Sequence, residues 1–71
     1  MTVDERKLKQ WIKQRRKIVK QKIRMDLRDL RKEIRVGDIG FAQITCRSII
    51  EWLEELYLLD LIERELLKGE E

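Results

Sequence analysis

Residues 4–35 form a run without glycine or proline, and this run constrains the fold more than any other feature of the sequence. Lys, Arg, Gln, Leu and Ile dominate the run, and all of these residue types tolerate or favour helix. Asp4 and Glu5 suit the positive end of a helix dipole, and Gly37 is typical of the residue that stops a helix. The run therefore predicts one helix from about residue 4 to residue 35, about 45 Å long at 1.5 Å per residue.

The apolar residues of this predicted helix form a stripe that needs a partner. Two rows within the stripe have a spacing of eleven residues, namely Leu8, Val19, Leu30 and Ile12, Ile23, Ile34. Eleven residues fill three helical turns, so the stripe runs nearly straight along the helix. The rest of the chain is too short to cover it fully, and soluble monomers rarely expose large apolar patches. We therefore expect a homodimer with this interface: Leu8, Ile12, Val19, Ile23, Leu27, Leu30 and Ile34.

Charged residues on the same side of the helix bear on the direction of that pairing. Arg15 and Lys22 lie towards one end of the stripe, and Asp26, Asp29 and Glu33 lie towards the other. An antiparallel homodimer would bring opposite charges together, whereas a parallel one would stack like charges. Local pairs four residues apart, such as Lys22 with Asp26, are the alternative use of these side chains.

The two halves of the chain carry opposite charge. Residues 1–36 hold 14 Lys or Arg against 5 Asp or Glu, a net charge of +9, and residues 37–71 hold 3 against 9, a net charge of −6. Ten basic residues and no acidic one lie between Arg6 and Arg24. Such a run is typical of a surface for nucleic acid or another acidic partner. The alternative is a solvated helix face that the acidic half of the same chain neutralises.

Composition excludes several classes of function. The chain has no histidine and a single cysteine, Cys46, so we expect no disulfide, no metal site and no cofactor. Nucleophile and general-base chemistry lacks its usual residues, and we therefore expect no enzyme. No apolar run is long enough to span a membrane and the charged start does not resemble a signal peptide, which predicts a cytoplasmic protein. Abundant interleaved charge with no proline, histidine or asparagine is typical of thermophile proteins.

The second half of the chain predicts shorter helices. Residues 38–43 fit one or two helical turns, and residues 46–59 have a helical apolar pattern that Thr45 can cap. Asp60 is placed where this helix would end, and residues 61–68 have room for a short β-hairpin. The expected fold is all-α, or α with a minimal β-wing, in one domain. Its parts are a long basic amphipathic helix in residues 1–35 and a helix-turn-helix unit in residues 36–71.

A stretch of the second half resembles a known family. The residues that carry the resemblance are Ile44-Thr45, Ile49, Trp52-Leu53, Leu56 and Asp60-Leu61-Ile62-Glu63-Arg64. Their pattern resembles winged helix-turn-helix DNA-binding regulators of the MarR/Lrp type, over roughly residues 34–65. Asp60 stands where that pattern has glycine. The resemblance implies a truncated winged-helix unit whose recognition helix covers residues 46–59. The outward side of this helix is acidic, with Glu51, Glu54 and Glu55 beside Arg47.

These observations together predict a small nucleic-acid-binding protein, either a transcription regulator or an architectural factor. The basic helix would make most phosphate contacts, on duplex DNA in preference to RNA, with no small-molecule substrate. The expected contacts are Lys13, Arg16, Lys17, Lys20 and Arg24, with Arg35 and Arg47 as secondary ones. The alternative is a helical protein-interaction or assembly module that binds no nucleic acid. Helix-turn-helix folds serve both purposes, so the fold alone does not decide between them.

Overall fold

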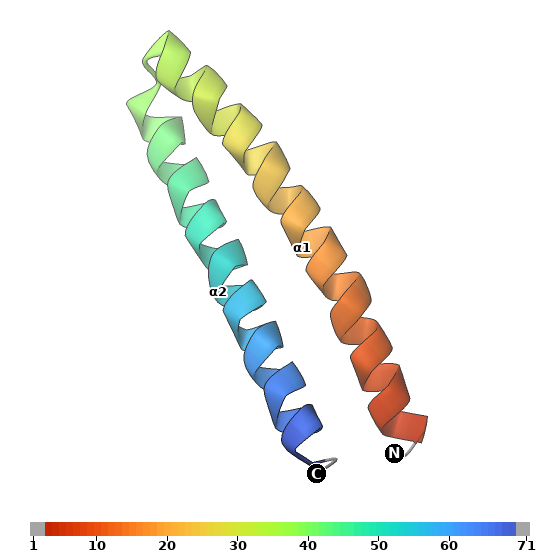
Figure 1. The fold of residues 1–71 in the computed structure, drawn as a ribbon. Coiled ribbons are helices and arrows are strands. Elements are labelled where there is room, and N and C mark those ends of the chain that lie inside the picture. Colours follow the sequence, from red (N-terminus) through yellow and green to blue (C-terminus); the bar gives the residue numbers. More distant parts are fainter. Residues whose placement is uncertain (1–2, 70–71) are drawn as a thin grey trace.

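The computed structural model describes residues 3–69, which form an antiparallel hairpin of two long helices (Figure 1). Helix α1 runs over Val3–Val36 and α2 over Ile39–Gly69. The two ends of the chain lie at the same end of the molecule, opposite the turn. The hairpin measures 52 × 16 × 12 Å. Residues 1–2 of the predicted long helix segment and residues 70–71 of the predicted helix-turn-helix unit lie outside the described residues.

The turn between the helices has a specific hydrogen-bonding pattern. The N–H of Asp38 donates to the carbonyl of Glu33 at 2.8 Å, and the N–H of Gly37 donates to that of Ile34 at 3.1 Å. This is the Schellman motif, which needs a residue with positive φ after the helix, and Gly37 has a φ of +78°. Asp38 then caps α2, because its side chain accepts a hydrogen bond of 3.1 Å from the N–H of Phe41. The predicted stop at Gly37 is confirmed.

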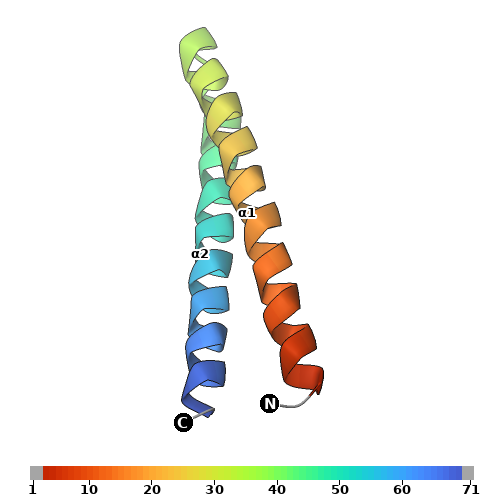
Figure 2. The same cartoon turned by 45° about the vertical axis from the view of Figure 1, so that its right-hand side comes forward.

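The two helices pack side by side with a seven-residue repeat (Figures 1 and 2). Apart from Arg15, the buried and half-buried residues of α1 recur at alternating spacings of four and three: Glu5, Lys9, Ile12, Arg16, Val19, Ile23, Asp26, Leu30 and Glu33. On α2 the corresponding positions are Ala42, Thr45, Ile49, Trp52, Leu56, Leu59, Glu63 and Leu66. We call these two sets the seam. A seam of this period is the signature of helices that wind around each other as a coiled coil.

The apolar core of the seam is small. Only Ile12, Val19 and Leu59 are buried among the described hydrophobic side chains, with Ile23, Leu30 and Trp52 half-buried beside them. The radius of gyration is 16.2 Å, whereas a compact domain of 71 residues would have about 11 Å. The hairpin is therefore elongated, with little interior of its own.

The structure corrects the expected division of the second half. The sequence pattern predicts a break near Thr45 and an end at Asp60, but α2 continues through both positions. Thr45 donates a hydrogen bond to Glu33 across the seam, and Asp60 accepts one from Arg16, so neither side chain caps a helix end. The seam also continues past Asp60, which gives residues 61–66 a surface to pack against.

The fold is all-α, as expected. Residues 34–65, which carry the resemblance to winged helix-turn-helix regulators, form the end of α1, the turn and most of α2. The described residues contain no strand, so the expected minimal β-wing at 61–68 is replaced by helix. Neither described helix has the length and hydropathy needed to cross a membrane.

Candidate nucleic-acid interface

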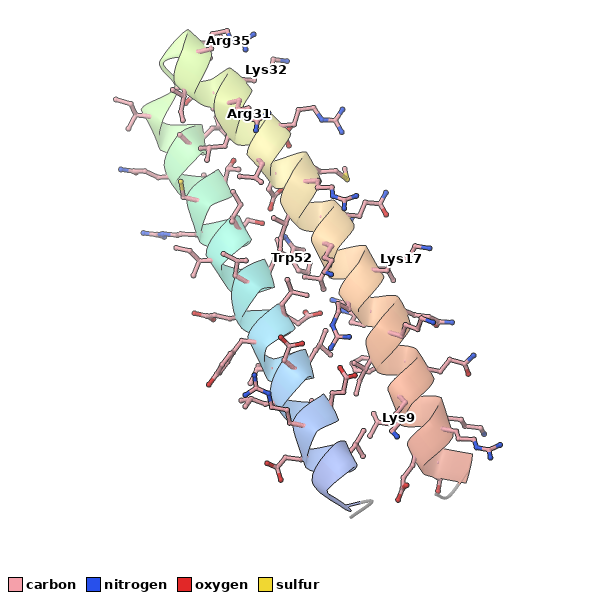
Figure 3. All side chains as sticks on the ribbon, viewed as in Figure 1. Lys9, Lys17, Arg31, Lys32, Arg35 and Trp52 are labelled. Atoms are coloured by element: carbon pink, nitrogen blue, oxygen red, sulfur yellow. The ribbon has the colours of Figure 1, made fainter. Side chains whose placement is uncertain are left out.

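The exposed surface of α1 carries a continuous row of cations that runs from the edge of the seam to the outer side of the helix. Its members recur at spacings of three or four residues: Lys13, Lys17, Lys20, Arg24, Arg28, Arg31 and Arg35. We call them the basic row, and Figure 3 labels three of them, Lys17, Arg31 and Arg35, along α1. From residue 13 to residue 35 the row is about 33 Å long, close to one turn of duplex DNA.

None of these seven cations has an ion-pair partner among the described residues, and all seven are exposed. The carboxylates of Glu55, Asp60 and Glu63 on α2 pair instead with Arg15 and Arg16. The basic row is therefore a surface of uncompensated positive charge. Such a surface attracts polyanions.

The structure brings most of the predicted contact residues together. Lys13, Lys17, Lys20, Arg24 and Arg35 all belong to the basic row. Arg28 and Arg31 also belong to the basic row but are not among the predicted contacts, although their spacing from Arg24 is a signal for including them.

The structure places two predicted contacts elsewhere. Arg16 points into the seam, where its Nη2 donates to Asp60 at 2.8 Å and also to Glu63. These two hydrogen bonds raise the pKa of Arg16 above its usual value, and the hydrogen bond to Glu63 has the larger effect. Arg47 lies on α2, exposed and away from the basic row. Arg16 is therefore engaged within the hairpin and not available for a phosphate.

The neighbouring Arg15 forms a second ion pair across the seam. Its Nε and Nη2 donate to the two carboxylate oxygens of Glu55, at 2.5 and 3.1 Å. This bidentate hydrogen bond lowers the pKa of Glu55 and raises that of Arg15. The guanidinium also lies 5.9 Å from the centre of the Trp52 ring, a cation–π distance. Both helices thus hold Arg15 in the hairpin.

Acidic residues of α1 have hydroxyl partners nearer the turn. The Oγ1 of Thr45 donates to both carboxylate oxygens of Glu33, at 2.6 and 3.0 Å, and the Oγ of Ser48 donates to Asp26 at 2.7 Å. The sequence left two uses of these acidic side chains open, pairing with a second copy or local pairing along the helix. In the structure, hydroxyl groups of α2 in the same chain are the partners of Glu33 and Asp26.

The predicted dimer interface divides in two. Ile12, Val19, Ile23 and Leu30 lie in the seam, covered by α2. The other three residues are exposed, namely Leu8, Leu27 and Ile34. The apolar stripe is thus largely a surface for the chain's own second helix, because α2 is 31 residues long and reaches along nearly all of α1.

No cluster of three or more His, Cys, Asp or Glu side chains suited to a metal ion is found within residues 3–69. Cys46 is exposed on α2. The basic row is thus the most distinctive chemical feature of the hairpin. No family model, no curated protein and no solved structure matches this chain.

Proposed function

We propose that the hairpin binds nucleic acid through the basic row of α1, by contacts to the phosphate backbone. The observation that supports this proposal is a row of seven exposed cations without ion-pair partners in the described chain. Proteins that neutralise phosphates in this way bind with little dependence on base sequence. An architectural role therefore fits better than recognition of a specific site.

The charge on α2 decides which helix faces the nucleic acid. The docking mode implied by the winged helix-turn-helix resemblance would place residues 46–59 in the major groove. Glu51 and Glu54 are exposed on that part of α2 and would approach phosphates with only Arg47 to compensate. The proposed complex therefore has α1 against the nucleic acid and α2 on the far side.

A salt titration with two matched double variants tests this proposal. Replacing Lys17 and Arg24 by Gln removes two members of the basic row. In the control variant, replacing Lys22 and Lys32 by Gln removes two exposed cations from another side of α1. Binding to a fluorescent 25-base-pair DNA duplex is followed by anisotropy between 50 and 300 mM NaCl. The first pair should lower the slope of log affinity against log salt by about 1.8, since each lost contact is worth roughly 0.9.

The control pair should change this slope much less. The proposal fails if the unmodified chain does not bind the duplex at 50 mM NaCl, or if both pairs lower the slope equally. A labelled single-stranded RNA of the same length, titrated in parallel, separates a preference for duplex DNA from a preference for RNA.

The second candidate function is a helical assembly module without nucleic-acid binding. It is favoured by the many large apolar side chains that the hairpin exposes on α2, such as Phe41, Ile50 and Tyr57. Stable self-association combined with no binding to DNA or RNA at low salt would select this candidate.

A further inference from the structure

A second apolar row follows α2, separate from the seam. It consists of Ile39, Gln43, Cys46, Ile50, Leu53 and Tyr57, whose spacings alternate between four and three. We call it the outer row, and it lies about 100° around α2 from the seam. Ile39, Ile50, Leu53 and Tyr57 are between 51% and 72% exposed. Helix α2 thus has two coiled-coil surfaces, of which the hairpin uses one.

The other exposed apolar row of the hairpin is more polar than the outer row. On α1, Trp11, Ile18 and Met25 are separated by Gln14 and Gln21 at three- and four-residue spacings. The outer row has a single amide, Gln43, among its six members between Ile39 and Tyr57. Exposure of the outer row to water is therefore the more unfavourable of the two.

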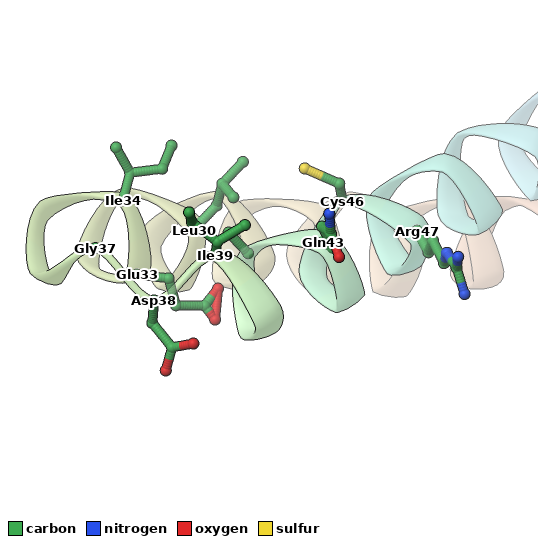
Figure 4. Close-up of a pocket in the computed structure, with 10 residues that line it drawn as sticks. Leu30, Glu33, Ile34, Gly37, Asp38, Ile39, Gln43, Cys46 and Arg47 are labelled. Atoms are coloured by element: carbon green, nitrogen blue, oxygen red, sulfur yellow. The ribbon is translucent and has the colours of Figure 1, made fainter.

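An open groove beside the turn extends the outer row onto α1. It measures about 550 Å³, and Leu30 and Ile34 of α1 line it together with Ile39, Gln43 and Cys46 of the outer row (Figure 4). The outer row thus continues near the turn into a surface formed by both helices.

The surface area of the hairpin matches the needs of a dimer. Its accessible surface is 6147 Å², whereas a folded monomeric protein of 8.7 kDa exposes about 4,700 Å². This excess of about 1,400 Å² per chain is larger than the roughly 800 Å² that each partner buries in a standard protein interface. One further helical hairpin of the same kind can cover such an area.

We infer that the outer row pairs with the outer row of a second copy, antiparallel, with the two-fold axis at the level of residue 48. This register places every member opposite another: Ile39 with Tyr57, Gln43 with Leu53, and Cys46 with Ile50. Tyr57 of the second copy then reaches the groove beside the turn. The two hairpins form a four-helix arrangement with two neighbouring faces of α2 occupied.

The two-fold axis brings like charges together at the edge of the outer row. Arg47 lies one residue from this axis, so each Arg47 is about 3 Å along the helix axis from Arg47 of the other copy and about 7.5 Å from its Glu54. The two-fold axis also puts both α1 helices on the same side of the α2 pair, so the two basic rows lie side by side. Dimerisation should therefore strengthen when salt screens their repulsion.

Sedimentation equilibrium at 1–100 µM chain, in 0.5 M NaCl, measures the association. The unmodified chain should be a dimer, and Ile50→Glu should raise its dissociation constant by about a hundredfold or more, because each copy would bury an unpaired carboxylate. Ile18→Glu is the matched control, since Ile18 is a 45% exposed isoleucine outside the outer row. Circular dichroism checks that both variants keep their helices, as both sites are exposed in the hairpin.

The like charges at the two-fold axis test the orientation. Arg47→Gln should strengthen an antiparallel dimer with this axis, because it removes the repulsion between the two Arg47 side chains. An unchanged dissociation constant at low salt would contradict this register. The Cys46 thiol supplies an independent readout, because its rate of reaction with a water-soluble disulfide reagent should fall as the chain concentration rises.

A monomer at 100 µM, an assembly larger than a dimer, or dissociation by Ile18→Glu with Ile50→Glu remaining dimeric would overturn this inference. The outcome is independent of the proposed function, since the assay contains no nucleic acid.

Discussion

At the scale of the residue, the few buried side chains carry a large share of the stability of this hairpin. Ile12 and Val19 are almost fully covered, at 1% and 0% exposure, while most other large apolar side chains remain partly in water. A buried side chain that is truncated loses its transfer free energy and leaves a cavity. The contribution of an isoleucine therefore depends on which side of α1 it occupies.

Ile12→Ala should lower the free energy of unfolding by about 2–4 kcal/mol, the usual range for a buried isoleucine. Ile18→Ala, the same change at a 45% exposed position, should cost less than about 0.5 kcal/mol. Urea unfolding followed by circular dichroism at 222 nm measures both. Equal losses would show that the two helices do not pack along the seam described above.

Polar residues of the seam explain the register of the hairpin. Arg15 and Arg16 meet carboxylates of α2 near the chain ends, while Asp26 and Glu33 meet hydroxyl groups near the turn. A shift of one helix by a heptad would leave several of these groups without partners, which is costly in a partly desolvated seam. The sequence shows these opposite charges but leaves their partners open, because a second copy, a neighbouring turn or α2 could each satisfy them.

At the scale of the element, the length of α2 is the main difference between expectation and structure. Local signals at Thr45 and Asp60 resemble a helix cap and a helix stop, yet α2 passes through both. Neither residue type forbids a helix interior, and packing along the seam outweighs their modest preference for helix ends. Gly37 behaves differently, since its positive φ makes the turn independent of packing.

Asp60→Pro distinguishes a continuous α2 from a helix that ends at this residue. In a helix interior proline removes a hydrogen bond and clashes with the preceding turn, so this variant should be about 3 kcal/mol less stable than Asp60→Ala, or lose the helix beyond residue 60. Asp60→Ala is the control because it removes the ion pair with Arg16 but keeps the helix. Equal ellipticity and equal urea midpoints of the two variants would mean that α2 ends before residue 60.

At the scale of the whole molecule, the hairpin separates its two surfaces. The basic row lies on the exposed surface of α1, and the outer row lies on α2 with its groove beside the turn. A nucleic acid and a second copy can therefore bind at the same time. A polyanion that bridges the two basic rows would strengthen the dimer. By thermodynamic linkage, dimerisation would increase the affinity of the hairpin for that polyanion by the same factor.

Small-angle X-ray scattering checks the inferred register through the length of the particle. The hairpin is 52 Å long, and α2 is centred on residue 54, six residues from the two-fold axis at residue 48. The two hairpins are then offset by about 18 Å, which gives a dimer about 70 Å long. A dimer no longer than the hairpin itself would contradict the antiparallel register and indicate a two-fold axis parallel to the helices.

The sequence by itself determined that the chain is helical, where the first helix ends, and that one side of this helix is basic. These properties are local, since they depend on helix preferences, on one glycine and on charges that no distant residue neutralises. Only the tertiary structure decided the period and the partner of the apolar stripe. Residues such as Lys9, Arg16, Asp26 and Glu33 occupy seam positions, so the seven-residue repeat is hidden from a pattern of apolar residues alone. Long polar side chains can occupy these positions because the seam of a two-helix hairpin is shallow, and they become satisfied only when α2 brings their partners.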